Sequence, residues 1–335
     1  MRTFSKVLLF LLLNIAILIA LTKTNPNVTK LKQSFNETES GRYETLLIGQ
    51  SHSEVCINPF IFSELTGMPT YDLGSSALPT ENVYYILKEG NRSHKCKRVI
   101  YDIDSNFFQK PLEPGGTYIF PDLTGATKME YLKDNAGKIP FFSVGVNFSQ
   151  NPAYILTAAE NLKRLMNNEE IIKKPVRYKN VKTYKYKGRG FLYGYNSRKP
   201  WKWKKRNFDV NKVDRRNLDT FIKIVEYCKA NNIELICVQS AVTPYRVRNQ
   251  NTEEIHNYFT ELCKSYDVPF YDMNYVKKDY MDPVQDDFVD QEGHMYGKMA
   301  GKQTKVLAEI IESEDKDKYF YSDYNDVQKR VAGKR

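Results

Sequence analysis

The sequence predicts an α/β fold built on a parallel sheet of five strands, with helices covering both faces. Short, continuously apolar runs predict the strands, because strands that are buried on both faces carry few polar side chains. Segments with helical spacing of apolar residues separate most of these runs. Turns containing glycine and serine follow the first two runs, at Gly49 and Gly74. This alternation along the chain is typical of a parallel sheet covered on both sides.

The predicted elements follow one another in a simple order. The expected strands are residues 43–48, 69–73, 98–104, 233–239 and 268–273, and the expected helices are residues 53–65, 80–89, 218–230, 253–265 and 296–311. Gly67 and Gly90 end the first two helices, as glycine commonly does. Ligands of such sheets bind beyond the carboxyl ends of the strands. Ser51, Gly74 and the turn at residues 104–106 are therefore expected to lie together.

Residues 107–217 separate the third and fourth strands and are too long for a simple crossover. They contain a predicted helix at residues 153–168 and a basic, aromatic segment at residues 172–208. Because long loops are usually functional, we interpret residues 107–217 as an insertion or a cap over the site. Residues 43–312 form the expected main domain. A linker at residues 23–42 and a charged, peripheral tail at residues 313–335 are expected to flank it.

The first 22 residues predict an export signal or a membrane anchor. Arg2 and Lys6 precede an apolar run at residues 7–21, which is interrupted by Asn14. Basic residues before such a run favour an orientation with the N-terminus inside. An uncleaved signal-anchor, a cleaved signal peptide and a buried helix are the three interpretations. We expect a single-pass cell-membrane protein with an extracytoplasmic main domain, and a secreted protein is the alternative.

Composition and charge narrow the class of protein. Of the 335 residues, 41% are hydrophobic and 27% are charged, which is ordinary for a globular protein and excludes wholesale disorder. The net charge of +10 is localised, because residues 172–208 contain fourteen Lys and Arg and no acidic residue. The rest of the chain has 36 basic against 40 acidic residues, a net charge of −4. The five cysteines have no metal-binding spacing, so we expect core thiols rather than a disulfide framework.

Two residues from distant parts of the chain carry the chemistry. Ser51 follows the first strand in the turn before its helix, where a hydroxyl projects from the sheet edge and backbone N–H groups can stabilise an oxyanion. His294 precedes the final helix, from where it can reach Ser51. A plain N-cap serine and a surface-loop histidine are the simpler interpretations of each residue alone. Their joint occurrence at these positions favours a nucleophile and its base.

With these motifs the chain resembles the SGNH/GDSL-type hydrolases. The first block of that family is a Gly-Asp-Ser-like turn, here Gly49-Gln50-Ser51-His52 with Gln in place of Asp. Its last block is Asp-x-x-His before the terminal helix, here Asp290 to His294 with one extra residue. The resemblance covers roughly residues 43–106 and 215–312. It implies a three-layer, flavodoxin-like fold and the roles of nucleophile, orienting acid and general base for Ser51, Asp290 and His294.

The resemblance also implies an oxyanion hole, and it leaves open which carboxylate orients His294. The N–H groups of Ser51 and Gly74 are the expected oxyanion donors, and the Asn106 side chain is the nearest candidate for a third. Glu292 or Asp287 are alternatives to Asp290, because of the extra residue. Among the other histidines, His52 is interpreted as a helix-start residue, and His94 and His256 as surface residues without partners.

The basic segment offers three interpretations. Cations and aromatic rings alternate in it, which suits a solvated hairpin or loop, attachment to an anionic envelope polymer or lipid headgroups, or stacking on nucleic acid. Export makes nucleic acid a poor partner, so none is expected. The expected polymer-binding residues are Lys185, Lys187, Trp201, Lys202, Trp203, Lys204 and Lys205.

The functional expectation joins these parts. The resemblance is to anchored, extracytoplasmic members of the family that act on cell-envelope polymers, such as the D-alanine transfer protein of the teichoic acid pathway and alginate O-acetylation proteins. It implies a serine esterase or O-acyltransferase acting on an acylated surface polysaccharide or another anionic envelope polymer. No cofactor and no metal are expected. The alternative is a catalytically silent SGNH-like protein that binds or assembles such a polymer.

Overall fold

A computed structural model of the chain describes residues 2–24, 29–139, 153–172, 183–196, 205 and 207–334. The chain divides into two compact units. One consists of Met1–Gln33 and Glu113–Tyr178, and the other of Ser34–Leu112 and Lys179–Arg335. The expected insertion is therefore split, because its first six residues and its part from Lys179 onward belong to the larger unit.

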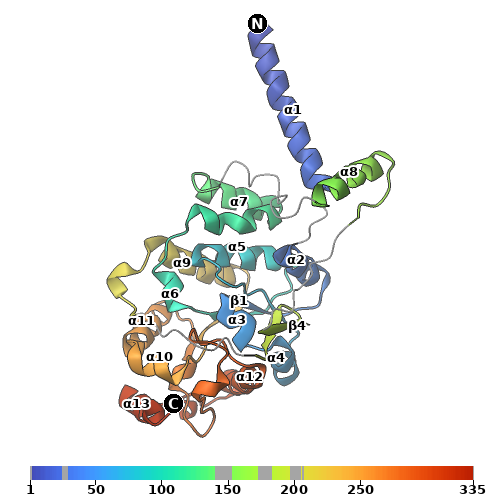
Figure 1. Cartoon of the computed structure of the whole chain (residues 1–335). Helices are drawn as coiled ribbons and strands as arrows, with labels where there is room; N and C mark the ends of the chain where they lie inside the picture. The colour runs from blue at the N-terminus through green and yellow to red at the C-terminus, as the bar shows by residue number, and fades with distance from the viewer. Residues whose placement is uncertain are drawn as a thin grey trace. The chain divides into compact units, whose positions relative to one another are not determined.

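The larger unit is built on a parallel sheet of five strands, as predicted (Figure 1). The strands are β1 (Thr45–Gly49), β2 (Thr70–Asp72), β3 (Arg98–Asp102), β6 (Glu234–Gln239) and β7 (Phe270–Asp272). Their order in the sheet is β2-β1-β3-β6-β7, and every neighbouring pair is parallel. This order is consistent with the flavodoxin-like arrangement of doubly wound sheets. All residues of β1 and β2 are buried, which explains the apolar run at residues 46–48 of β1.

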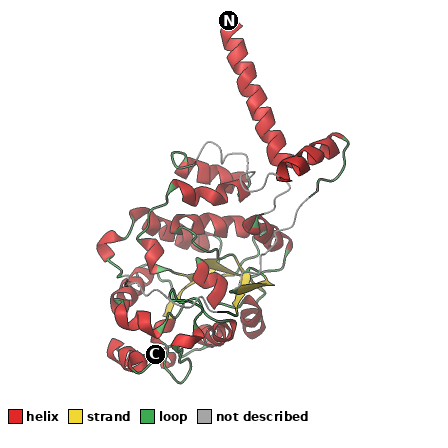
Figure 2. Ribbon diagram, viewed as in Figure 1, coloured by secondary structure: helices red, strands yellow, loops and turns green. Residues whose placement is uncertain are grey.

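Helices cover the sheet on both sides (Figure 2). On one side α5 (Thr80–Gly90) and α9 (Arg215–Ala230) contact each other, and they pack against β1 and β6 respectively. On the other side α3 (Ser51–Cys56) and α4 (Pro59–Thr66) contact α12 (Gly297–Glu312). The remaining elements between β6 and β7 are α10 (Pro244–Asn249) and α11 (Thr252–Lys264), and the short α6 (Ser105–Phe108) follows β3. The five cysteines are buried free thiols, as expected of core residues.

The first predicted helix, residues 53–65, is in fact two helices. The break lies between Cys56 and Pro59, because a proline lacks the N–H that a continuing helix needs and is favoured at the first turn of a new one. The Asn58 side chain caps α4 by accepting a hydrogen bond from the Phe60 N–H at 3.0 Å. The separate α3 is thus a short helix that begins at Ser51.

An antiparallel hairpin from the basic segment belongs to the larger unit. Its strands are β4 (Tyr184–Gly188) and β5 (Phe191–Gly194). At the tip, the Arg189 carbonyl accepts a hydrogen bond from the Asp72 N–H at 2.9 Å. Gly190 has a φ of +84°, and a Cβ there would lie 1.8 Å from the Asp72 carbonyl oxygen, so this close approach requires glycine. The hairpin is therefore packed against the end of β2 rather than solvated on all sides.

The structure differs from the expectation of a linker and a peripheral tail. Residues 30–40 form a helix, α2 (Lys30–Ser40), in which Phe35 is fully buried. At the other end, α13 (Tyr324–Ala332) buries Val327 and Val331. Arg330 in α13 donates hydrogen bonds to the carbonyl oxygens of Asn274 and Val276 at 2.7 and 2.8 Å. Few apolar residues in each segment are enough to fix an otherwise polar helix.

The elements described in the smaller unit are helices. They are α1 (Arg2–Thr24), the 3-10 helix η1 (Pro114–Asp122), α7 (Gly125–Asn135) and α8 (Ala153–Met166). The α8 helix contacts α1, and its fully buried Asn161 donates to the Thr24 carbonyl at 3.0 Å. Among the residues that the structure describes, no helix combines the length and the apolar character that crossing a membrane requires.

Candidate active site

The candidate site lies beyond the carboxyl end of β1, where the sequence predicts it. Gly49 ends the strand with a φ of +145°, and a Cβ there would lie 2.5 Å from the Asp102 carbonyl oxygen of the neighbouring strand β3. Glycine at this position lets the chain turn tightly between two strands. Ser51 is then the first residue of α3, and its side chain is half-buried at the edge of the sheet.

The structure brings Ser51, His294 and Asp290 together in one chain of hydrogen bonds. The distance from Ser51 Oγ to His294 Nε2 is 2.7 Å. On the other side of the imidazole, Nδ1 lies 2.8 Å from Asp290 Oδ2. A carboxylate on one imidazole nitrogen and a hydroxyl on the other fix the tautomer in which Nε2 can accept the hydroxyl proton. The arrangement has the geometry of a serine nucleophile, its base and an orienting acid.

The loop that carries His294 is held by the same Asp290. This carboxylate is buried, with 5% of the residue exposed, and its Oδ1 accepts a hydrogen bond from the Glu292 N–H at 3.0 Å. Gly293 has a φ of +96°, which allows the turn back toward His294. The Val289 N–H then donates to the His294 carbonyl at 2.7 Å. The extra residue between the acid and the histidine is thus accommodated in a tight turn around the Asp290 side chain.

The alternative acids do not contact the imidazole of His294. The Asp287 carboxylate accepts a hydrogen bond from the Val284 N–H at 2.8 Å and lies in the 3-10 helix η5 (Gln285–Asp287). Glu292 meets the site through its backbone carbonyl, described below. Asp290 is therefore the carboxylate that the structure places on His294.

His52 is a second histidine of the site, which the sequence interpretation assigned to the start of the helix. Its ring is stacked on that of His294, with 5.0 Å between the centroids and 25° between the planes. Its Nδ1 lies 3.4 Å from Asp104 Oδ2, and its Nε2 lies 2.9 Å from the Glu292 carbonyl oxygen. Because His52 directly follows Ser51 in the sequence, its closeness to the site could have been expected. Its partners, Asp104 and Glu292, are distant in the sequence and could not.

The buried charges behind the site stabilise each other. Burial lowers the pKa of His52, but the Asp104 carboxylate outweighs it and the net pKa is raised. Conversely, burial raises the pKa of Asp104, but the contact with His52 and the charge of Arg246 bring it well below its usual range. Burial raises the pKa of Asp102 to about 6, although Ser240 donates two hydrogen bonds to its carboxylate. The buried pair of His52 and Asp104 thus lies next to the imidazole of His294.

The expected oxyanion donors are only partly brought to the site. Gly74 does not line the cavity around Ser51, and its N–H donates to Asp72 Oδ1 at 2.6 Å. A Cβ on Gly74 would lie 2.9 Å from Ser53 Cβ, so glycine serves the packing of this turn against α3. Asn106 does line the cavity, and its side-chain amide donates to Asp104 Oδ1 at 3.1 Å. The structure thus keeps Asn106 at the site and turns the Gly74 amide toward Asp72.

The cavity in front of the triad has a volume of about 400 Å³. Its lining includes the polar residues Ser51, His52, Ser76, Asn106, Lys110 and His294. Tyr184 and Leu192 of the hairpin complete the apolar part of the wall. The hairpin therefore contributes directly to the wall of the cavity.

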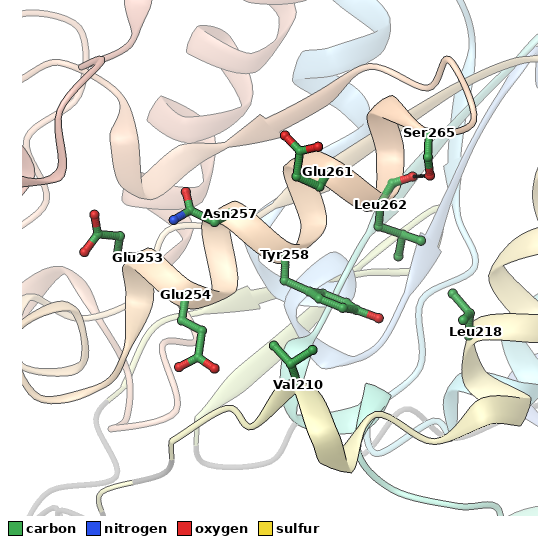
Figure 3. Close-up of a pocket in the computed structure, with 9 residues that line it drawn as sticks. All are labelled: Val210, Leu218, Glu253, Glu254, Asn257, Tyr258, Glu261, Leu262 and Ser265. Carbon is green, nitrogen blue, oxygen red and sulfur yellow. Dashed lines mark hydrogen bonds between the residues drawn. The ribbon is translucent and has the colours of Figure 1, made fainter.

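A larger hollow of about 690 Å³ lies elsewhere in the same unit and offers different chemistry. It is lined by apolar residues of α9 and α11 and by the acidic Glu253, Glu254 and Glu261 (Figure 3). Tyr258 extends from α11 above Val210 of the 3-10 helix η3 (Val210–Lys212). The described residues that line this hollow include no histidine that could serve Ser265 as a base. Size alone would select this hollow, but the arrangement of reactive groups selects the cavity at Ser51.

The polymer-binding prediction falls only partly on described residues. Lys185 and Lys187 are exposed on β4, and their ammonium groups lie 4.8 and 5.6 Å from the ring centroids of Tyr195 and Tyr193. Lys205 is exposed as well. Trp201, Lys202, Trp203 and Lys204 lie outside the described residues.

His256 differs from its interpretation as a surface residue without partners. Its Nδ1 lies 3.1 Å from Asp272 Oδ2, and its ring is stacked on that of Tyr275 with 3.7 Å between the centroids.

Within the described parts of the chain, no three His, Cys, Asp or Glu side chains are grouped as ligands of a metal ion.

Comparisons with known proteins do not identify the family. No protein-family model matches the chain, and no curated protein is significantly similar to it in sequence. The assignment of a function therefore depends on the site itself.

Proposed function

We propose that the protein is a serine esterase or O-acyltransferase of the SGNH type. The single observation that carries the proposal is the hydrogen-bonded series Ser51–His294–Asp290, with 2.7 and 2.8 Å between its donors and acceptors. A serine hydroxyl is a weak nucleophile unless a base accepts its proton, and this geometry provides the base and fixes its orientation. The position of the series beyond the carboxyl end of the first strand is typical of catalytic sites in such sheets.

The reaction proceeds in two half-reactions. Ser51 Oγ attacks the carbonyl carbon of an acyl ester while its proton passes to His294 Nε2. The C–O bond to the leaving alcohol then breaks, and the alcohol oxygen takes that proton from the imidazolium, leaving an acyl-serine. Water or a sugar hydroxyl next gives its proton to His294 and attacks the acyl carbon, and the return of the proton to Ser51 Oγ frees the enzyme.

The oxyanion of the tetrahedral intermediate requires donors in the cavity. The Ser51 N–H, in the first turn of α3, and the side-chain amide of Asn106 are the groups that fit this role, because both residues line the cavity. Loss of one such donor typically costs about 3 kcal/mol of transition-state stabilisation. The Gly74 N–H donates to Asp72 Oδ1 instead, and this is the observation that favours the alternative, a catalytically silent binding protein.

Labelling with a fluorophosphonate probe tests the proposal directly. The probe reacts rapidly with a serine whose proton a base can accept and hardly at all with an ordinary serine hydroxyl. We expect labelling of the full chain at Ser51, measured by mass spectrometry of the modified peptide, and no labelling of the Ser51→Ala variant. A wild-type protein that stays unlabelled at Ser51 would establish the catalytically silent alternative.

We further propose an acylated, anionic envelope polymer as the substrate, and a location outside the cytoplasm with a membrane attachment at residues 1–22. The motivation is the basic segment and the apolar run of the N-terminus. We expect the full chain to fractionate with membranes when cells are broken. Recovery of a soluble form that begins near Lys23 would show that the segment is a cleaved signal peptide instead.

Three described lysines of the basic segment, two of them in the hairpin, provide a test of the proposed polymer. Neutralising Lys185, Lys187 and Lys205 to Gln is expected to weaken binding of an anionic polysaccharide and to flatten its dependence on salt, because screening acts on charge. Hydrolysis of a small neutral ester should stay within about twofold, since none of these three side chains lines the cavity. Unchanged polymer affinity at low ionic strength would leave a solvated hairpin as the interpretation of these charges.

A further inference from the structure

The loop between Asp290 and His294 is fastened at its middle residue by two side chains from other elements. The Glu292 carbonyl oxygen accepts a hydrogen bond from His52 Nε2 at 2.9 Å and a second one from Arg246 Nη1. His52 comes from α3 and Arg246 from α10, so two separate helices hold one carbonyl. A carbonyl oxygen has two lone pairs, and both are used here.

Both donors are themselves fixed and shielded from water. His52 is 8% exposed and its other ring nitrogen faces the Asp104 carboxylate at 3.4 Å. Arg246 is 7% exposed, and its Nε donates to the Gln250 side chain at 3.0 Å. Hydrogen bonds shielded from water are stronger than exposed ones, and the one from the Arg246 guanidinium is strengthened further by its charge. The Glu292 carbonyl is therefore held from two sides by groups that cannot easily reorient.

The same contacts connect the nucleophile to its base. Ser51 and His52 are consecutive residues at the start of α3, and the ring of His52 is stacked on that of His294. Cys56, one turn further along α3, approaches the next carbonyl of the loop, that of Gly293, with its Sγ at 3.7 Å. The helix that carries the nucleophile thus also holds the loop that carries the base.

We propose that His52 and Arg246 are positioning residues, which hold the Glu292 carbonyl and thereby keep His294 at hydrogen-bonding distance from Ser51. The inference rests on the proposed function for its catalytic consequence, but the loop contact itself does not depend on it. Three residues lie between Asp290 and His294, and one of them is Gly293, which has a positive φ. Because glycine adopts positive and negative φ about equally well, the backbone of this loop could change conformation if the two donors were removed.

Two substitutions at His52 separate hydrogen bonding from packing. His52→Phe keeps a ring against His294 and removes both nitrogens, whereas His52→Gln keeps an N–H donor at the place of Nε2. We expect kcat for a small acetyl ester to fall about 10- to 100-fold in His52→Phe with little change in KM, because displacement of a reacting group by about 1 Å costs this much. His52→Gln should recover most of the loss. Arg246→Met, which removes the second donor independently, should also lower kcat.

Matched controls are available in the same unit. His256→Phe removes a histidine that also faces a carboxylate and is stacked on a ring, but does not line the cavity. Arg248→Met removes an arginine of the same α10 helix that donates to carbonyl oxygens of Val331 and Lys334 instead. Both controls should keep the wild-type kcat.

A second readout is independent of catalysis. Amide hydrogen exchange of residues 289–295 should become faster in His52→Phe and Arg246→Met than in the wild type and the controls, because the hydrogen bonds of the turn open more often. In the His294→Ala background, His52→Phe should lower the residual rate no further. Unchanged exchange in this loop, or an equal loss of kcat in His52→Gln and His52→Phe, would overturn the positioning role. Faster exchange in the two variants, together with a wild-type protein that hydrolyses no ester, would support the loop contact and refute the proposed function.

Discussion

Replacing Ser51 or His294 by alanine is expected to lower kcat for a small acetyl ester by at least about a thousandfold. Ser51→Ala removes the nucleophile, and His294→Ala removes the base that lies 2.7 Å from it. The double variant should be no slower than either single variant, because a nucleophile without its base and a base without its nucleophile are equally ineffective. Steady-state hydrolysis of the ester by the purified full chain measures all three rates.

The same variants should remain folded. Ser51 is half-buried and the His294 side chain is 13% exposed at the edge of the sheet, so we expect the free energy of unfolding to change by less than about 1 kcal/mol for Ser51→Ala and somewhat more for His294→Ala. Thermal unfolding provides this control. Either single variant with the wild-type rate and a normal fold would show that the hydrogen-bonded series is not the catalytic group.

Asp290→Asn is expected to lower kcat by about a thousand- to ten-thousandfold, the range of tautomer-disrupting substitutions in such triads. The Asp290 carboxylate accepts a hydrogen bond from His294 Nδ1 at 2.8 Å, whereas an amide can present its NH₂ group and favour the tautomer with hydrogen on Nε2. An imidazole in that tautomer cannot accept the Ser51 proton. The amide oxygen can still accept the Glu292 N–H, so the loop itself should be retained.

Asp287→Asn is the matched control, because this carboxylate is three residues away and caps a 3-10 turn through the Val284 N–H. We expect the wild-type rate for it. A large loss of kcat in Asp287→Asn together with a normal rate in Asp290→Asn would show that Asp290 is not the acid that orients His294. The pH-rate profiles of both variants, compared with that of the wild type, report whether the remaining activity still depends on an imidazole.

The sheet could be predicted because its strands are buried on both faces, and two of them contain the apolar runs 46–48 and 235–238. The turn after β1 and the loop before α12 follow from the topology, which is why Ser51 and His294 could be selected. Asp290 was selected through the resemblance to the SGNH/GDSL-type hydrolases. The helices α2 and α13 were not predicted, because each buries one pair of apolar residues, Leu31 and Phe35 or Val327 and Val331, which gives a weak periodic signal in a polar segment.

Other parts of the site depend on contacts that no local pattern contains. The Gly74 amide was an expected oxyanion donor, but the Asp72 carboxylate two residues earlier turns back and binds it. His52 finds its carbonyl partner 240 residues further along the chain. Tyr184 and Leu192 belong to a segment whose charge suggested solvent exposure, yet they line the cavity, because alternate residues of a hairpin face opposite sides.

The separation between the nucleophile and its base also has a consequence for when activity appears. Ser51 and His294 are 243 residues apart, and the hairpin that lines the cavity lies between them in the sequence. During synthesis, the nucleophile and most of the sheet emerge long before the histidine does, and contacts between such distant residues form late in folding. A nascent or truncated chain that ends before residue 294 therefore carries an inert serine, so reactivity is acquired only after nearly the whole unit has been made.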